Sequence, residues 1–127
     1  MGMDASFLKY PKSEYNRETD AKDENFADSR VSPYEPIYID ALEYLHNERE
    51  LHKLMVDYVQ DRYDMEFRNS AYYQIAEVDV RLLIHRNANS EHYSSRVEQI
   101  LQELLADMIK SRYKDVEIYD YYYTSNW

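Results

Sequence analysis

Cysteine is absent from this sequence, and glycine is almost absent. Without cysteine the chain can form neither disulfides nor thiolate centres, which excludes a small disulfide-rich secreted fold and a zinc–cysteine site. The single glycine, Gly2, excludes every glycine-rich loop of the kind that cradles phosphates. We expect a cytoplasmic protein, and nothing in the sequence indicates a cofactor or a metal.

Long apolar runs are missing as well. No stretch approaches the roughly 18 consecutive apolar residues of a membrane-spanning helix. Residues 1–10 also lack the basic region and apolar core that mark a signal peptide. We therefore expect neither a membrane span nor a signal peptide.

Basic residues are outnumbered by acidic ones. The chain has 15 lysines and arginines against 25 aspartates and glutamates, which gives a formal net charge of -10. A surface of that sign repels phosphate backbones, so direct nucleic-acid binding is disfavoured. A protein partner is instead expected to present a basic surface.

The residues that are present predict one folded domain. A chain of 127 residues, of which 44% are hydrophobic, is long enough for one core and too short for two. Tyrosine, with 15 residues, supplies most of the aromatic content. We expect a single domain over residues 1–127 that carries a long polar excursion at 12–35.

The clearest helical pattern covers Ile39–Tyr63, with a start near Pro36. At 100° per residue, one face collects apolar residues and one histidine, namely Ala41, Tyr44, Leu45, Leu51, His52, Met55, Val59 and Tyr63. The opposite face collects polar residues, namely Glu43, His46, Glu50, Asp57, Asp61 and Asp64. The pattern predicts a helix that packs one side on the core.

A second amphipathic helix is predicted over Ser95–Tyr113, with Ser95 as its cap. Its apolar spacing is carried by Val97, Ile100, Leu101, Leu104, Leu105 and Met108. Between the two helices, residues 76–86 fit either a strand or a helix. We favour a short strand at Tyr72–Ile75 followed by a helix.

Both ends of the chain are predicted to be strands. Asp4–Tyr10 is short and stops at Pro11, and Val116–Tyr123 is β-branched and aromatic. Neither strand can satisfy its backbone alone, so we expect them to pair with each other. The predicted fold class is α+β, with a small antiparallel sheet from the terminal strands packed on two amphipathic helices.

His52 is the most informative polar residue of the predicted apolar face. Glu48 precedes it by one helical turn, so the two could form a hydrogen-bonded pair. Such a pair could be a general base with its orienting group, or two metal ligands, and Asp4 would join them if the first strand crosses the helix. Since no nucleophile or further ligand is identifiable, a buried core histidine that packs on Met55 and Val59 is the simpler interpretation.

Carboxylates recur along the opposite side of the same helix, at Glu43, Glu50, Asp57, Asp61 and Asp64. A solvated face is the usual explanation. The alternative is a phosphate-like row that occupies a basic nucleic-acid groove on another protein.

Three tyrosines of the closing strand, Tyr119, Tyr121 and Tyr123, share one face because side chains alternate along a strand. Tyrosine is enriched at protein interfaces, which would suit a partner or a second copy of the chain. Core packing is the equal alternative, because the buried face of a sheet also needs large rings.

Motifs at both ends and in the centre occur together. The chain opens with Met1–Asp4, carries Tyr44–Leu45 and Leu51–Asp61 in its centre, and closes with Tyr122–Trp127. In these motifs it resembles a group of uncharacterised phage and bacterial proteins. Members of that group typically open Met-Gly-Leu-Asp-Met-Tyr-Leu, carry a Tyr-Trp-Arg-Lys-x-Asn-x-Ile-His-x-Trp-Phe-Val helix, and close Tyr-Tyr-x-Ser-x-Trp.

The chain also departs from that group. Where the group has Trp-Arg-Lys-x-Asn, this chain has Leu45–Arg49, so a site built on that arginine, lysine and asparagine would be lost. Of the polar set only His52 remains. The resemblance implies a phage or prophage origin and a shared fold, and it implies nothing catalytic.

These observations lead to one preferred hypothesis and two alternatives. The preferred function is a non-enzymatic phage accessory protein of the host cytoplasm that acts by protein binding, as an acidic inhibitor of a host nucleic-acid enzyme or defence complex. The first alternative is a small hydrolase or metal-dependent enzyme centred on His52, with Glu48 and Asp4. The second is a structural homo-oligomer assembled through the closing tyrosines.

Overall fold

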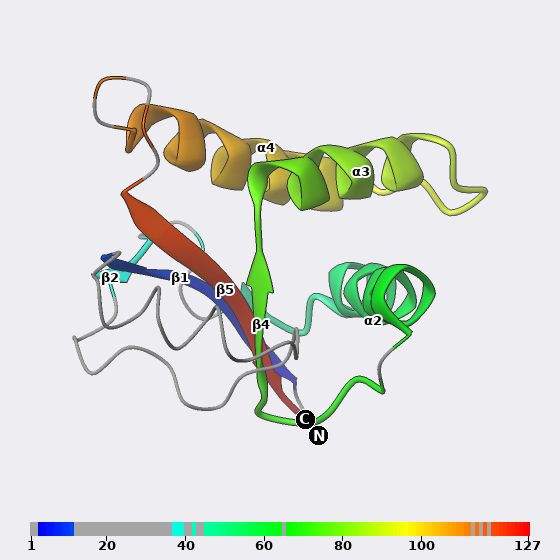
Figure 1. The fold of residues 1–127 in the computed structure, drawn as a ribbon. Coiled ribbons are helices and arrows are strands. Elements are labelled where there is room, and N and C mark those ends of the chain that lie inside the picture. The colour runs from blue at the N-terminus through cyan, green and yellow to red at the C-terminus, as the bar shows by residue number, and fades with distance from the viewer. Residues whose placement is uncertain are drawn as a thin grey trace.

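The computed structural model describes residues 3–11, 37–39, 42, 45–64, 66–112, 114, 116 and 118–127. These residues form an α+β fold in which three helices cover one face of an antiparallel sheet (Figure 1). In chain order the elements are β1 (Asp4–Pro11), β2 (Ile37–Tyr38), β3 (Leu45–His46), α2 (Arg49–Tyr63), β4 (Tyr72–Ile75), α3 (Glu77–Ala88), α4 (Ser95–Lys110) and β5 (Tyr119–Asn126). The predicted fold class is confirmed, whereas the excursion at 12–35 lies outside the described residues.

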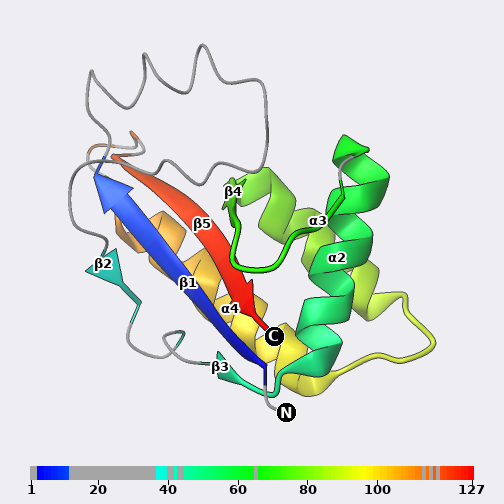
Figure 2. The same ribbon diagram turned by 90° about the horizontal axis from the view of Figure 1, so that it is seen from below.

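The two terminal strands form the centre of the sheet. β1 and β5 pair antiparallel along their whole length, from Asp4 opposite Asn126 to Pro11 opposite Tyr119. The strand order is β2-β1-β5-β4, and the short β3 also pairs with β1 (Figure 2). The predicted pairing of the chain ends is confirmed, but the closing strand is β5, which begins at Tyr119 rather than at Val116 and continues to Asn126.

The first long helix, α2, begins at Arg49, so the predicted start at Ile39 was wrong. Leu45 and His46 instead form β3, because β1 offers their backbone a ladder partner. Asn47 then adopts a left-handed φ of 56°, which a helix interior does not allow. The end at Tyr63 is as predicted, and Asp64 closes the helix in the left-handed conformation.

The remaining helices follow the sequence pattern closely. The strand Tyr72–Ile75 and the helix after it are both present, as β4 and α3. The cap of α4 is Ser94, one residue before the predicted Ser95, and its hydroxyl accepts the Val97 amide hydrogen at 3.2 Å. This helix ends at Lys110 rather than Tyr113, and all of its predicted core residues, Val97, Ile100, Leu101, Leu104, Leu105 and Met108, are buried.

The main core lies between the helices and the sheet. Phe7, Tyr123 and Tyr73 form one cross-strand row on the helix side, and all three rings are fully buried. Leu8, Tyr10 and Tyr122, which alternate with that row, form a second and smaller apolar cluster. Within the described ranges, no helix is long and apolar enough to cross a membrane.

Candidate functional site

The acidic side of α2 is a narrow stripe of exposed carboxylates. Glu50, Asp57 and Asp61 are seven and four residues apart, which at 3.6 residues per turn places them on one line of the helix surface. Asp64 is exposed just beyond the helix, at its left-handed end. Two residues that were predicted for this face are not seen on it. His46 belongs to β3, and Glu43 lies outside the described residues.

The carboxylates of this stripe differ in their ion pairs with the described part of the chain. Asp61 forms an ion pair with Arg86 of α3, with Oδ2 and Nη1 2.9 Å apart. Glu50 and Asp57 form no ion pair with any residue that the structure describes. Lys53 lies between them on the edge of the stripe. Arg62 is on the other side of the helix, where its Nε is 3.5 Å from Asp79.

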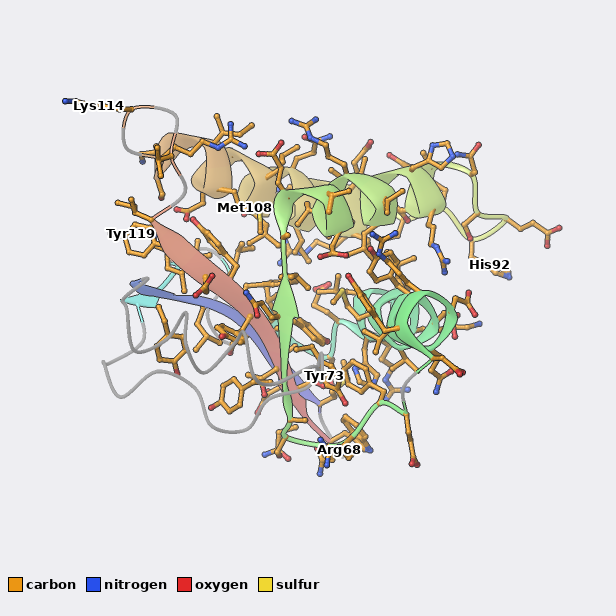
Figure 3. The ribbon with its side chains drawn as sticks, in the orientation of Figure 1. Arg68, Tyr73, His92, Met108, Lys114 and Tyr119 are labelled. Atoms are coloured by element: carbon orange, nitrogen blue, oxygen red, sulfur yellow. The ribbon has the colours of Figure 1, made fainter. Side chains whose placement is uncertain are left out.

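Glu50 and Asp57 border a hollow of about 180 Å³ between α2 and the end of α3. Lys53 and Leu54 complete its α2 side, and Asn87, Ser90 and His92 form the other side. His92 extends from the loop between α3 and α4 (Figure 3). Asn87 is buried and holds this loop in place, because its amide donates to the Ser94 carbonyl at 2.9 Å and its side-chain oxygen accepts from the Ser94 amide at 3.2 Å.

The predicted cluster of Asp4, Glu48 and His52 is not assembled. The Asp4 carboxylate contacts His46 Nδ1 at 2.7 Å, at the exposed pairing of β1 with β3. Glu48 contacts Arg96 Nε at 3.2 Å, and its backbone rather than its side chain bonds His52. The Glu48–His52 side-chain pair, which the sequence left open as one possibility, is therefore not formed: Glu48 is the residue before the first turn of α2, and its carboxylate contacts Arg96 instead.

His52 lies among aromatic rings near the end of the chain, and it is half-buried rather than largely buried. Its ring is 4.9 Å from that of Trp127 and 5.4 Å from that of Phe67, and its Nδ1 is 3.4 Å from the Tyr123 hydroxyl. Burial lowers the pKa of His52, so the imidazole is neutral at pH 7. Among the described residues, no three histidine or carboxylate side chains converge as a metal site would require.

The tyrosines of β5 are core residues. Tyr123 is fully buried and its ring is 5.0 Å from that of Phe7, while Tyr121 is 6% exposed and donates its hydroxyl to Asp107 at 2.7 Å. Tyr119, at the start of the strand, is half-buried. Of the two interpretations open for these residues, core packing is the one the structure shows for Tyr121 and Tyr123.

Sequence reasoning missed a polar network that centres on Lys9. The Lys9 ammonium donates to Asp107 Oδ2 and to Ser111 Oγ, both at 2.9 Å, and lies 4.7 Å from the Tyr119 ring centroid. Burial alone would raise the pKa of Asp107, but hydrogen bonds from Tyr121, Lys9 and Ser111 and the charge of Lys9 lower it. The Lys9 side chain thus joins β1 to the end of α4 through its bonds to Asp107 and Ser111.

A second missed network joins α2 to α3. Asp79 is 3% exposed and accepts hydrogen bonds from the hydroxyls of Tyr58 and Tyr63, the latter at 2.7 Å. Its other oxygen accepts the Ala76 amide hydrogen at 2.8 Å. Burial, followed by these bonds to the carboxylate, raises the pKa of both tyrosines. The network fixes the rotation of α2 and therefore the direction of its acidic stripe.

Comparison of the chain with known protein families, with curated proteins and with solved structures found no match. The assignment of a candidate site therefore rests on the geometry of this chain alone. Of the residues predicted for partner binding, Glu50, Asp57, Asp61 and Asp64 lie together on the surface.

Proposed function

We propose that this chain is a phage or prophage accessory protein that acts by binding another protein through the acidic stripe of α2. Its partner presents a basic surface, as the nucleic-acid groove of a host enzyme or defence complex does, and the chain inhibits that partner by occupying the groove. The observation that carries the proposal is that Glu50 and Asp57 are exposed beside a hollow and have no ion pair among the described residues.

Exposed carboxylates that no described residue pairs with suit such a role for two reasons. Exposed ion pairs contribute little to stability, so an exposed carboxylate that is left unpaired costs the fold almost nothing. The same charges attract a basic partner over a Debye length of about 8 Å at physiological salt and speed its association. Hydrogen bonds from Tyr58 and Tyr63 to Asp79 hold α2 against α3, so binding of the partner does not have to include the entropy cost of ordering this helix.

The test begins with affinity capture from a bacterial lysate at low salt, followed by elution with salt or with double-stranded DNA. A partner that uses its nucleic-acid groove should be released by DNA as well as by salt. Binding rates are then measured against ionic strength for the wild type and for the triple variant E50K/D57K/D61K. We expect the triple variant to associate at least tenfold more slowly at low salt and to show a flatter salt dependence.

A matched control separates the position of the charges from the net charge. The variant E66K/E98K/E103K makes the same change in net charge at carboxylates outside the stripe and its hollow, and it should associate nearly as fast as the wild type. Equal slowing in both triple variants would mean that only the overall charge matters. Unchanged binding in E50K/D57K/D61K would place the contact surface elsewhere on the chain.

A further inference from the structure

A cavity of about 130 Å³ lies where β4 leads into α3 and where β5 begins. Met108 and Tyr119, labelled in Figure 3, reach it from α4 and from the start of β5, and Ile75 and Ile118 extend this apolar wall. Ile75 is 2% exposed, whereas Ile118 is 39% exposed and joins the cavity to the surface. The proposed function does not use the cavity, because the acidic stripe and its hollow lie at the other end of α3.

The two carboxylates that line the cavity are already engaged within the protein. Glu77 contacts both Arg81 and Arg112. Asp120 accepts the Gln74 amide at 3.3 Å and takes part in a further interaction. A charged molecule that leaves water loses its hydration and needs an unengaged partner in exchange. The carboxylates of this cavity do not provide one, which favours an uncharged occupant.

The groups that attract cations are occupied as well. The Lys9 ammonium lies 4.7 Å from the ring centroid of Tyr119 and 5.9 Å from that of Tyr121, and both tyrosines line the cavity. The same ammonium donates to Ser111 Oγ, another lining group, and to Asp107, both at 2.9 Å. A second cation in the cavity would therefore meet a positive charge beside its aromatic wall.

One polar group of the wall still has capacity to bind a ligand. Gln74 donates from its side-chain amide to Asp120, and its side-chain oxygen has no hydrogen-bond partner among the described residues. A carboxamide oxygen has two lone pairs and accepts hydrogen bonds from neutral donors such as hydroxyl groups. An occupant with one hydroxyl can thus donate to Gln74 while its apolar body lies against the isoleucines and Met108.

We propose that this cavity binds a small uncharged ring compound that carries one hydroxyl group, of which phenol is a simple example. Its ring lies against Ile75, Met108 and Ile118, and its hydroxyl donates to the Gln74 oxygen. The Met108 thioether adds a favourable contact with an aromatic ring. Because an apolar cavity of about 150 Å³ is known to hold one benzene ring, a cavity of about 130 Å³ holds a ring of about six carbons. A nucleotide is too large to enter.

The experiment titrates phenol, cyclohexanol and cyclohexylamine into the full chain labelled with ¹³C in its isoleucine and methionine methyl groups. All three probes consist of a six-carbon ring with one polar group, and only cyclohexylamine is charged at pH 7. We expect saturable NMR shifts at Ile75, Met108 and Ile118 with phenol and with cyclohexanol. Cyclohexylamine should bind at least tenfold more weakly than cyclohexanol.

Two matched variants test whether the shifts report the cavity. Ile118→Trp places a larger side chain at its exposed edge and should fill it, so the phenol shifts at Ile75 and Met108 should disappear. Ile109→Trp makes the same change at a 45% exposed isoleucine of α4 that does not line the cavity, and it should bind phenol as the wild type does. Gln74→Leu removes the acceptor and should weaken phenol binding several-fold while the circular dichroism spectrum stays unchanged.

Four results would overturn the proposal. They are the absence of a saturable shift with phenol, equal affinity for cyclohexylamine and cyclohexanol, undiminished phenol binding in Ile118→Trp, and equal loss of binding in Ile109→Trp. If Ile118→Trp fails to fold, Gln74→Leu takes its place. Undiminished phenol binding in that variant would then refute the assigned position of the hydroxyl.

Discussion

Replacing Asp79 by alanine tests whether a buried carboxylate holds α2 against α3. The substitution removes the acceptor of the Tyr58 hydroxyl, which lies in the core, and the group that caps the Ala76 amide. A buried donor left without a partner costs about 1–3 kcal/mol, and the loss of a helix cap costs about 1 kcal/mol. Tyr63 is partly exposed and can turn to water. We therefore expect Asp79→Ala to lower the free energy of unfolding by about 2–4 kcal/mol.

Tyr58→Phe provides the partner for a double-mutant cycle. It removes the hydroxyl together with its hydrogen bond and leaves no orphaned donor, so it should cost only about 1 kcal/mol. In the Tyr58→Phe background, Asp79→Ala no longer strands a buried hydroxyl. The two substitutions should consequently couple, with a combined cost about 1 kcal/mol or more below the sum of the single costs.

Urea unfolding followed by circular dichroism measures all four proteins of the cycle. Because the lesion is local, the dependence of the free energy on urea concentration should stay the same across the set. An Asp79→Ala cost below about 0.5 kcal/mol, within the usual range of surface substitutions, would refute the reasoning. Strict additivity of the two substitutions would refute the claim that the Tyr58 hydroxyl depends on Asp79.

Further predictions concern other contacts. Burial lowers the pKa of His52, so the unfolded chain takes up a proton more readily than the folded chain, and the free energy of unfolding should fall as the pH drops below about 6.5. Urea midpoints measured between pH 5 and 8 should show a smaller fall in His52→Gln than in the wild type. Lys9→Met leaves the Asp107 carboxylate without its cation, and thermal unfolding should show a loss of about 1–3 kcal/mol, restored in part by also changing Asp107 to asparagine. Removal of residues 124–127 takes away the end of β5 and the Trp127 backbone bonds to Asn69, so the thermal midpoint should fall by several degrees. An unchanged midpoint would contradict the stabilising role of this end of the sheet.

The sequence by itself determined the elements whose pattern has only one solution. In α4 the apolar residues recur at helical spacing with a serine at the start, so the helix and its buried face could be predicted without any neighbour. The pairing of the two chain ends followed from β-prone runs that cannot satisfy their backbones alone. The strand at Tyr72–Ile75 was favoured by the sequence and is present. The exposed carboxylates Glu50 and Asp57 were also found, because a helix fixes which residues share its surface.

Only the tertiary structure decided the features that depend on contact with a distant part of the chain, namely the start of α2 and the partners of the polar side chains. Leu45 fits a helical pattern, but the edge of β1 supplies it with a strand ladder, which moved the start of α2 to Arg49. Lys9 finds its carboxylate on α4, 98 residues later, and no local spacing encodes that distance. For the same reason the actual partners of Asp4, Glu48 and His52, which are His46, Arg96 and Tyr123, could not be predicted. Each polar side chain bonds the group that packing brings nearest. That group is fixed by how the helices lie on the sheet, not by the separation of the residues in sequence.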